Sequence, residues 1–247
     1  MGYLFNNRDL FFNDYDFSNI VKVEKVERKL LPSIASTSKN ILGKNGNLFL
    51  GNRLEPLVFK VTCRIFKNKN QTLEDIRLIL AEKLYTKSPK LLYLRNEKYP
   101  YLAIVDGTQD YEPKRSSTAE ILINFVAHDP YSYGENKIIT ANNNKFEFNY
   151  SASAESKGIF ELVVDRDVSE IVITDNVYFS RLKLIHKFKQ GNKVKVDCIK
   201  KEITVNNNKM MHILDFDSDF FEIQKGTNKY LLSEGVSGKL TYTERWI

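Results

Sequence analysis

The chain has 247 residues, of which 42% are hydrophobic, 12% aromatic and 28% charged, with 6 Pro and 11 Gly. This composition is typical of a folded globular protein and excludes collagenous, low-complexity and disordered chains. The length suits two domains of about 100 to 150 residues, and the 16 Phe and 13 Tyr, set among Val- and Ile-rich runs, favour β-sheet.

The net charge of +6 is spread along the chain rather than gathered in one place. Residues 1–130 carry 20 Lys and Arg against 15 Asp and Glu, a net of +5, and the remainder carries 17 against 16, a net of +1. Acidic residues interrupt the basic ones, as in residues 23–28. We therefore expect a mixed solvated surface and no specific nucleic-acid binding.

Cysteine content and hydropathy indicate a protein made in a reducing cytoplasm. Cys63 and Cys198 lie far apart in the sequence, so neither a disulfide framework nor a paired-cysteine metal motif is predicted. No stretch approaches the ~20 apolar residues of a membrane span, and residues 1–9 contain no signal-peptide core. We expect no membrane insertion.

The first elements predicted along the chain are two strands separated by an arm. Apolar and polar residues alternate over residues 20–28 and 57–66, as in strands with one buried face. Between them, residues 36–50 are mostly polar, with Gly and Asn at 43–46 between short apolar runs. Because Gly and Asn accept positive φ at low cost, this arm is predicted to be an extended hairpin.

One helix is predicted, directly after the second strand. Thr72 and Asp75 have the spacing of a capping box, in which each side chain satisfies a free backbone amide of the first turn. Apolar residues then recur at spacings of three and four: Leu73, Ile76, Leu80 and Leu84. This stripe is expected to lie on a sheet, and Pro89 is expected to end the helix.

A second hairpin and a further strand complete the predicted N-terminal domain. Residues 91–94 and 99–105 bracket a polar turn, and residues 121–126 form an apolar run. The segment 129–134 then introduces Pro130 and Gly134 and a change of pattern. We place the domain boundary here, giving an N-terminal domain of residues 1–130 and a C-terminal domain of residues 131–247.

The C-terminal domain is predicted to be a β-sandwich. Short strands recur without helical periodicity at residues 145–150, 158–164, 170–174, 182–188 and 194–205, with two more before the end of the chain. Lys200 and Lys201 are predicted to form the turn of a hairpin within residues 194–205. Asn-rich turns separate the strands, which favours jelly-roll-like or Greek-key connections.

No catalytic, cofactor-binding or metal-binding residue is predicted. His128, His186 and His212 are isolated, and none has a metal-ligand spacing to another His or Cys. The chain contains no nucleophile elbow, phosphate loop or dinucleotide fingerprint. We therefore do not expect an enzyme.

Two local patterns leave alternatives open. Asp215, Asp217 and Asp219 alternate with a spacing that would suit three carboxylate ligands of calcium, but the Gly and Glu of an EF-hand loop are missing. The favoured alternative is a solvated turn whose aromatic residues, Phe216, Phe220 and Phe221, enter the core. Tyr131 and Tyr133 either stack on sugars or bases or, as we favour, pin the segment between the domains.

Three stretches occur in an order and spacing that match a known family. They are residues 91–107, where a hairpin with Arg95 and Glu97 runs into an aromatic strand; residues 125–133, an aromatic Asp-Pro-Tyr junction; and residues 219–228 followed by 240–246, resembling closing strands. In these stretches, which together span nearly the whole chain, the sequence resembles the distal tail proteins (Dit) of siphophages that infect Gram-positive bacteria.

The resemblance implies a mainly β fold and a structural role. The N-terminal domain would carry one helix and an extended hairpin, or belt, placed at residues 36–50, and would form a homo-hexameric ring, single or double. The C-terminal domain would be a sandwich like galectins and carbohydrate-binding modules, and would dock other proteins. Such a protein is made in the host bacterial cytoplasm and sits at the distal tail tip of the virion, where it joins the tail tube protein to a tail-associated fibre or lysin protein and to receptor-binding or baseplate proteins.

Two other functions compete with this one. The sandwich pattern and the tyrosines permit a carbohydrate-binding module that recognises host cell-wall glycan. The abundant acidic residues permit a wall-degrading hydrolase, although one sequence cannot show which carboxylates meet. No galectin sugar-binding residues can be aligned onto residues 135–247, which favours docking over sugar binding.

Overall fold

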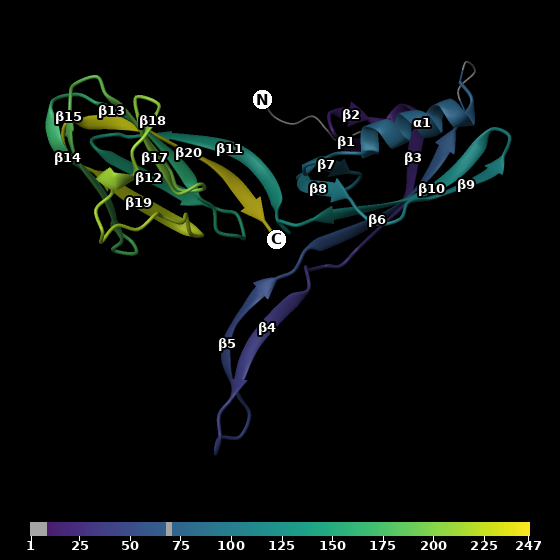
Figure 1. Ribbon diagram of the computed structural model, residues 1–247, viewed down its shortest axis with the longest axis horizontal. Helices are drawn as coiled ribbons and strands as arrows, with labels where there is room; N and C mark the ends of the chain where they lie inside the picture. Colours follow the sequence, from purple (N-terminus) through teal and green to yellow (C-terminus); the bar gives the residue numbers. More distant parts are fainter. Residues whose placement is uncertain (1–8, 68–70) are drawn as a thin grey trace. The chain divides into compact units, whose positions relative to one another are not determined.

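The computed structural model describes residues 9–67 and 71–247, and its described residues form β-strands and a single α-helix (Figure 1). The mainly β fold with one helix is confirmed. The chain divides after Tyr133 into two compact units, and Ile247 groups with the first. Residues 1–8 of the predicted N-terminal domain lie outside the described residues. Each unit has its own hydrophobic core.

An antiparallel sheet forms the N-terminal unit, with strands in the order β7-β8-β10-β6-β3 and β9 pairing with β10 beside β8. The elements are β1 (Leu10–Phe12), β2 (Tyr15–Asp16), a 3-10 turn (Phe17–Asn19), β3 (Val21–Arg28), β4 (Ile34–Asn40), β5 (Asn47–Leu54), β6 (Leu57–Phe66), α1 (Leu73–Leu84), β7 (Lys90–Leu94), β8 (Tyr101–Val105), β9 (Asp110–Arg115) and β10 (Thr118–Ala127). Strands β6 and β10 pair over their whole length, from Leu57 opposite Ala127 to Phe66 opposite Thr118.

Alternation along β6 determines which face of this sheet is buried. Its apolar residues Leu57, Phe59, Val61, Cys63 and Ile65 are each at most 3% exposed, while the residues between them are exposed or half-buried. Burial of one such side chain is worth roughly 1.5 to 3 kcal/mol. A slip of one residue in register would lose this burial along the whole strand.

Helix α1 covers the buried face of the sheet and begins where the capping box places it (Figure 1). The Thr72 hydroxyl accepts a hydrogen bond from the Asp75 amide at 3.1 Å, and the Asp75 carboxylate accepts one from the Thr72 amide at 2.7 Å. The Thr72 hydroxyl also donates to the Asp75 carboxylate at 2.7 Å, and the two bonds that this carboxylate accepts lower the pKa of Asp75. The chain leaves the helix at Tyr85, whose amide donates to the Ala81 carbonyl, so the helix ends before Pro89 rather than at it.

Among the described residues, strands β4 and β5 pair only with each other and form a separate two-stranded ribbon (Figure 1). The predicted hairpin is confirmed, but it is longer than residues 36–50 and extends from Ile34 to Leu54. Residues 41–46 connect the strands, with Gly43 at φ 82° and Gly46 at φ 80°. The run Ile41–Leu42, predicted to flank this loop, lies within it.

The sequence prediction missed five strands: β1, β2 and β18 (Asn208–Lys209), which have two or three residues each, and the longer strands β9 and β11. Strand β9 contains Pro113 and four charged residues and pairs only with β10, an edge position where Pro is tolerated. Strand β11 (Ser132–Thr140) begins inside the segment assigned to the domain boundary, where Ser132 pairs with Tyr101. The segment 129–134 is therefore not a loop throughout.

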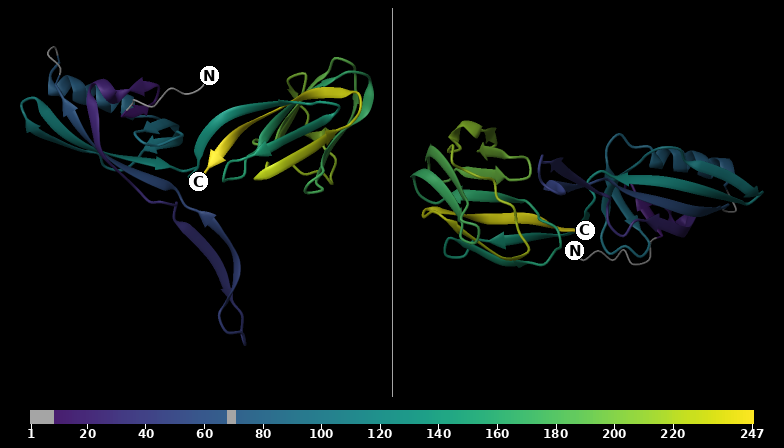
Figure 2. Two further views of the ribbon diagram at one scale, coloured as in Figure 1. Left: turned by 180° about the vertical axis from the view of Figure 1, so that it is seen from behind. Right: turned by 90° about the horizontal axis from the view of Figure 1, so that it is seen from below.

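Two facing sheets form the C-terminal unit (Figure 2). The strands are the later part of β11, β12 (Lys145–Tyr150), β13 (Gly158–Val164), β14 (Val168–Asp175), β15 (Arg181–Phe188), β16 (Lys193–Asp197), β17 (Glu202–Val205), β18 (Asn208–Lys209), β19 (Gly226–Leu232) and β20 (Val236–Trp246), with a 3-10 turn at Met211–Ile213. One sheet has the order β18-β17-β16-β13-β20-β11, and the other has the order β12-β19-β14-β15. The predicted sandwich is confirmed, whereas its likeness to galectins stays a prediction.

The buried Tyr150 hydroxyl is paired with backbone groups at one end of this sandwich. The Tyr150 hydroxyl donates to the Ala154 carbonyl at 2.7 Å and accepts from the Arg245 amide at 3.0 Å, which joins the end of β12 to the end of β20. Gly238 allows β20 to approach β13 closely, because a Cβ there would lie 2.4 Å from the Glu161 carbonyl oxygen.

Both cysteine thiols are predicted to be inert in the native protein. Cys63 and Cys198 are fully buried, and burial raises the pKa of each thiol to about 12. At pH 8 the native protein should release no colour from a disulfide reagent such as dithionitrobenzoate, and both thiols should react after unfolding in guanidinium. Reaction of a native thiol within minutes would contradict the burial of these strands.

Candidate interaction surfaces

The histidines belong to both units, His128 to the first and His186 and His212 to the second. His128 and His212 are exposed and His186 is half-buried, with its ring centroid 5.1 Å from that of Phe188 in an edge contact. Within residues 9–67 and 71–247, no group of three or more His, Cys, Asp and Glu side chains could hold a metal ion.

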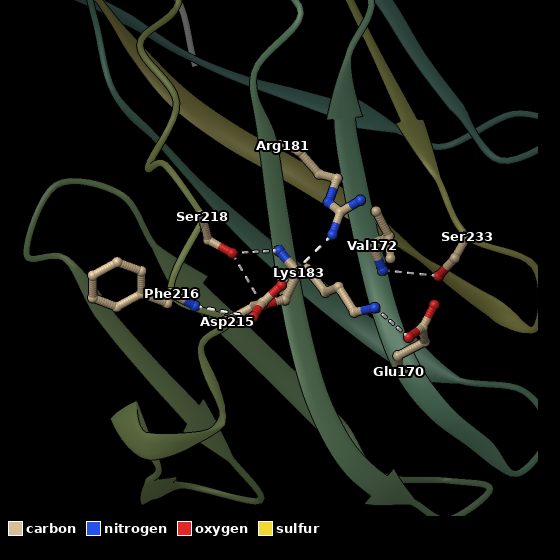
Figure 3. A network of polar contacts seen from close by, with 8 residues as sticks. All are labelled: Glu170, Val172, Arg181, Lys183, Asp215, Phe216, Ser218 and Ser233. Carbon is tan, nitrogen blue, oxygen red and sulfur yellow. Dashed lines mark hydrogen bonds and ion pairs between the residues drawn. The ribbon is translucent and has the colours of Figure 1, made fainter.

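The Asp215–Asp219 segment runs along the outer edge of β15 (Figure 3). The amide of Asp215 donates to the Lys183 carbonyl at 2.9 Å, and the amide of Asp219 donates to the Arg181 carbonyl at 2.9 Å. Between them the Ser218 hydroxyl accepts from the Lys183 amide at 2.9 Å. The segment therefore occupies hydrogen-bonding groups that an edge strand would otherwise present to other chains.

The carboxylate of Asp215 has a structural task in this segment. It accepts a hydrogen bond from the Phe216 amide at 3.0 Å and lies 3.6 Å from the Arg181 guanidinium (Figure 3). Phe221 is buried and Phe220 packs against the core, as predicted. Phe216 is 100% exposed, so the prediction that it enters the core is wrong. The hydrogen bonds of Asp215 and Asp219 to β15 turn the Phe216 side chain away from the sheet.

The loop between β14 and β15 carries further exposed apolar side chains. Buried Asp175 accepts hydrogen bonds from the amides of Val177 at 2.8 Å and Tyr178 at 3.1 Å. Phe179 follows with φ 58°, a conformation disfavoured for aromatic residues, and is 88% exposed. We refer to residues 177–179, the exposed Ile185 of β15 and Phe216 together as the outer-sheet surface of the C-terminal unit. The sequence signal for this surface is the run of large apolar residues 177–179 in a turn, which the sequence analysis does not single out.

The arm, residues 34–54, carries several uncovered apolar side chains of the N-terminal unit. Its exposed apolar side chains are Ile34, Ile41, Leu42, Leu48, Phe49 and Leu50. The arm contains Lys39, Lys44 and Arg53 but no Asp or Glu. An exposed apolar surface of this kind marks a site of protein association.

Tyr131 and Tyr133 are half-buried in the N-terminal unit. The Tyr133 hydroxyl donates to the Asp129 carboxylate, and the Tyr133 amide donates to the Pro100 carbonyl at 2.8 Å. These contacts favour the interpretation that the tyrosines fix this segment over the interpretation that they form an open stacking platform.

Comparison with protein families gives a match to each unit. Residues 12–127 match the phage tail protein RIFT-related domain, and residues 151–246 match the siphovirus-type tail component, C-terminal domain. A comparison with curated protein sequences finds no match.

Solved structures share the fold over nearly the whole chain. The crystal structure of the Dit protein of phage SPP1, titled a paradigm of the hub adsorption apparatus of phages infecting Gram-positive bacteria, aligns with a TM-score of 0.82 at 15% identity, covering 97% of this chain and 99% of that one. Chains of the phage p2 baseplate in its activated conformation, with strontium or calcium, align with a TM-score of 0.52 at 9% and 12% identity, covering 94% of this chain and 93% of those.

Two β-rich units with uncovered apolar surfaces, each matching a tail-protein domain, define a structural component of a phage tail. More narrowly, the chain belongs to the distal tail protein (Dit) family of siphophages, the structural proteins of the tail hub. None of the helices formed by the described residues has the length and apolar character needed to cross a membrane.

The network on β15 predicts different effects for two neighbouring substitutions. Ser218→Ala removes the acceptor for the Lys183 amide and should lower the free energy of unfolding by about 1 kcal/mol. Phe216→Ser alters a fully exposed side chain and should change it by less than about 0.5 kcal/mol. Urea unfolding followed by the fluorescence of Trp246, the one tryptophan of the chain, measures both. A larger loss for Phe216→Ser would contradict its exposed position.

Proposed function

We propose that this protein forms a hexameric ring at the distal end of the phage tail, in which the arm of each copy grips the next copy. The observation that carries the proposal is the arm itself, whose apolar side chains are exposed and whose strands pair only with each other. An isolated two-stranded ribbon is at best marginally stable in water. The arm therefore gains stability by packing against another surface.

A ring also explains why the binding element projects as an arm. Copies related by rotation about one axis meet through two different patches, and the ring closes only if that contact fixes the angle between them. An arm and a receiving surface on the same chain provide two such patches. The ring would join the tail tube protein to the tail-associated fibre or lysin protein.

The C-terminal unit would serve as the docking domain for receptor-binding or baseplate proteins. Its outer-sheet surface presents Phe179 and Phe216 on backbone held by hydrogen bonds. Aromatic side chains on ordered backbone are typical anchors of protein interfaces. We propose no turnover of a substrate and no carbohydrate recognition, since the tyrosines that prompted the latter are half-buried in the N-terminal unit.

Shortening the arm tests the proposal. In light scattering after size exclusion, the full chain should have six times the monomer mass of 28.7 kDa, or twelve times for a double ring. Replacing residues 37–51 with Asn-Gly keeps the Ser36–Asn52 pair and gives a two-residue turn. This variant should remain monomeric and keep a cooperative unfolding transition, because the cores of both units lie outside the replaced residues.

A matched control separates loss of the arm from general loss of apolar surface. Phe216→Ser removes an exposed aromatic group from the other unit and should leave the oligomer intact. Rings formed by the shortened variant would contradict the proposal that the arm holds the next copy. A full chain that stays monomeric at high concentration would remove the ring.

A further inference from the structure

A groove of about 410 Å³ lies in the N-terminal unit at the C-terminal end of α1. Its apolar wall is formed by Leu80, Leu84 and Tyr85 on one side and by Val105, Tyr111 and Ile121 on the other. Tyr85 is 74% exposed, although it is one of the largest apolar groups there. The groove is thus an uncovered apolar surface on the same unit that carries the arm.

Acidic groups border this groove. Asp106 and Asp110 flank its lining residues and are exposed, and neither carboxylate forms an ion pair with another described residue. The last carbonyls of α1 add the partial negative charge of a helix C-terminus. The one cation in the wall, Arg77, is held by Glu74 through two hydrogen bonds of 2.6 and 2.8 Å.

One polar atom in the groove wall also lacks a partner. The Thr86 hydroxyl is buried and forms no hydrogen bond with any described residue. Such groups are rare in folded proteins, because each costs about 1 to 3 kcal/mol. An occupant that brings a donor or acceptor would satisfy it.

The arm has the complementary properties. It is apolar along its exposed surface and has no acidic residue, and its tip carries Lys39 and Lys44, which form no ion pair with another described residue. Its connecting loop also contains Asn45, which both donates and accepts hydrogen bonds. The apolar, basic and amide groups of the arm are thus complementary to an apolar groove with acidic neighbours and an unpaired hydroxyl.

We infer that the groove between α1 and strands β9 and β10 receives the arm tip of a second copy of this chain, with Lys39 and Lys44 facing Asp106 and Asp110. The inference rests on the proposed ring and names the surface that the arm grips. Arm and groove are different patches of one unit, so the contact is head-to-tail and repeats around a ring.

Charge reversal tests the match. Lys39→Glu with Lys44→Glu, or Asp106→Lys with Asp110→Lys, should each raise the concentration needed for half-assembly by at least about tenfold, because like charges would face each other. Combining all four substitutions restores opposite charges and should recover assembly. The control, Lys193→Glu with Lys195→Glu, makes the same charge change at exposed positions of the C-terminal unit and should have no effect.

Disulfide trapping identifies which copy supplies the arm. Leu42→Cys with Tyr85→Cys, oxidised and run under non-reducing denaturing conditions, should give a ladder of cross-linked species, because the native Cys63 and Cys198 are buried. Cross-links confined to one chain would overturn the second copy as occupant. If the wild type forms rings but charge reversal has no effect, or if the four-fold variant does not recover, the groove assignment fails and the ring survives. A wild type that never assembles overturns both.

Discussion

The pairing of β6 with β10 is the constraint on which the rest of the N-terminal unit depends. Ten residues of each strand pair without a register shift, and alternate side chains of β6 are buried under α1. That burial fixes the register, since a slip of one residue would place Lys60 and Arg64 in the core. It also fixes where the arm departs, because the chain leaves the sheet after Arg28, opposite Phe59, and returns at Leu57.

The balance between apolar burial and lost backbone entropy differs between the sheet and the arm. In the sheet, each buried apolar side chain stabilises the fold by roughly 1.5 to 3 kcal/mol, and these contributions offset the entropy lost on ordering the backbone. In the arm, Leu42, Phe49 and Leu50 remain exposed, so ordering the ribbon brings little burial in return. A partner surface would supply the missing burial, which is the physical basis for the proposed assembly through the arm.

Prediction from sequence succeeded where a single buried face determines the pattern. The alternation of β6, the stripe and capping box of α1, and the bounds of β12 and β13 are all read from residue spacing. It failed where tertiary partners decide: β9 is a charged strand with Pro113 that exists because β10 offers an edge. Phe216 was assigned to the core because it is aromatic, but pairing of Asp215 and Asp219 with β15 turns it outward. The groove beside α1 could not be predicted, because its lining residues are scattered over residues 77–121 and meet only in the fold.

The β15 edge of the C-terminal unit presents side chains rather than free backbone groups to a binding partner. On the C-terminal unit, the Asp215–Asp219 segment covers backbone groups of β15, which opposes recognition by strand addition there. What remains available at that edge is side chains, namely Phe179, Ile185 and Phe216. Side-chain recognition needs a shaped counterpart, whereas backbone pairing accepts almost any extended chain. A hub that must hold particular neighbours in place is better served by the former, since specificity is a difference in affinity between right and wrong partners.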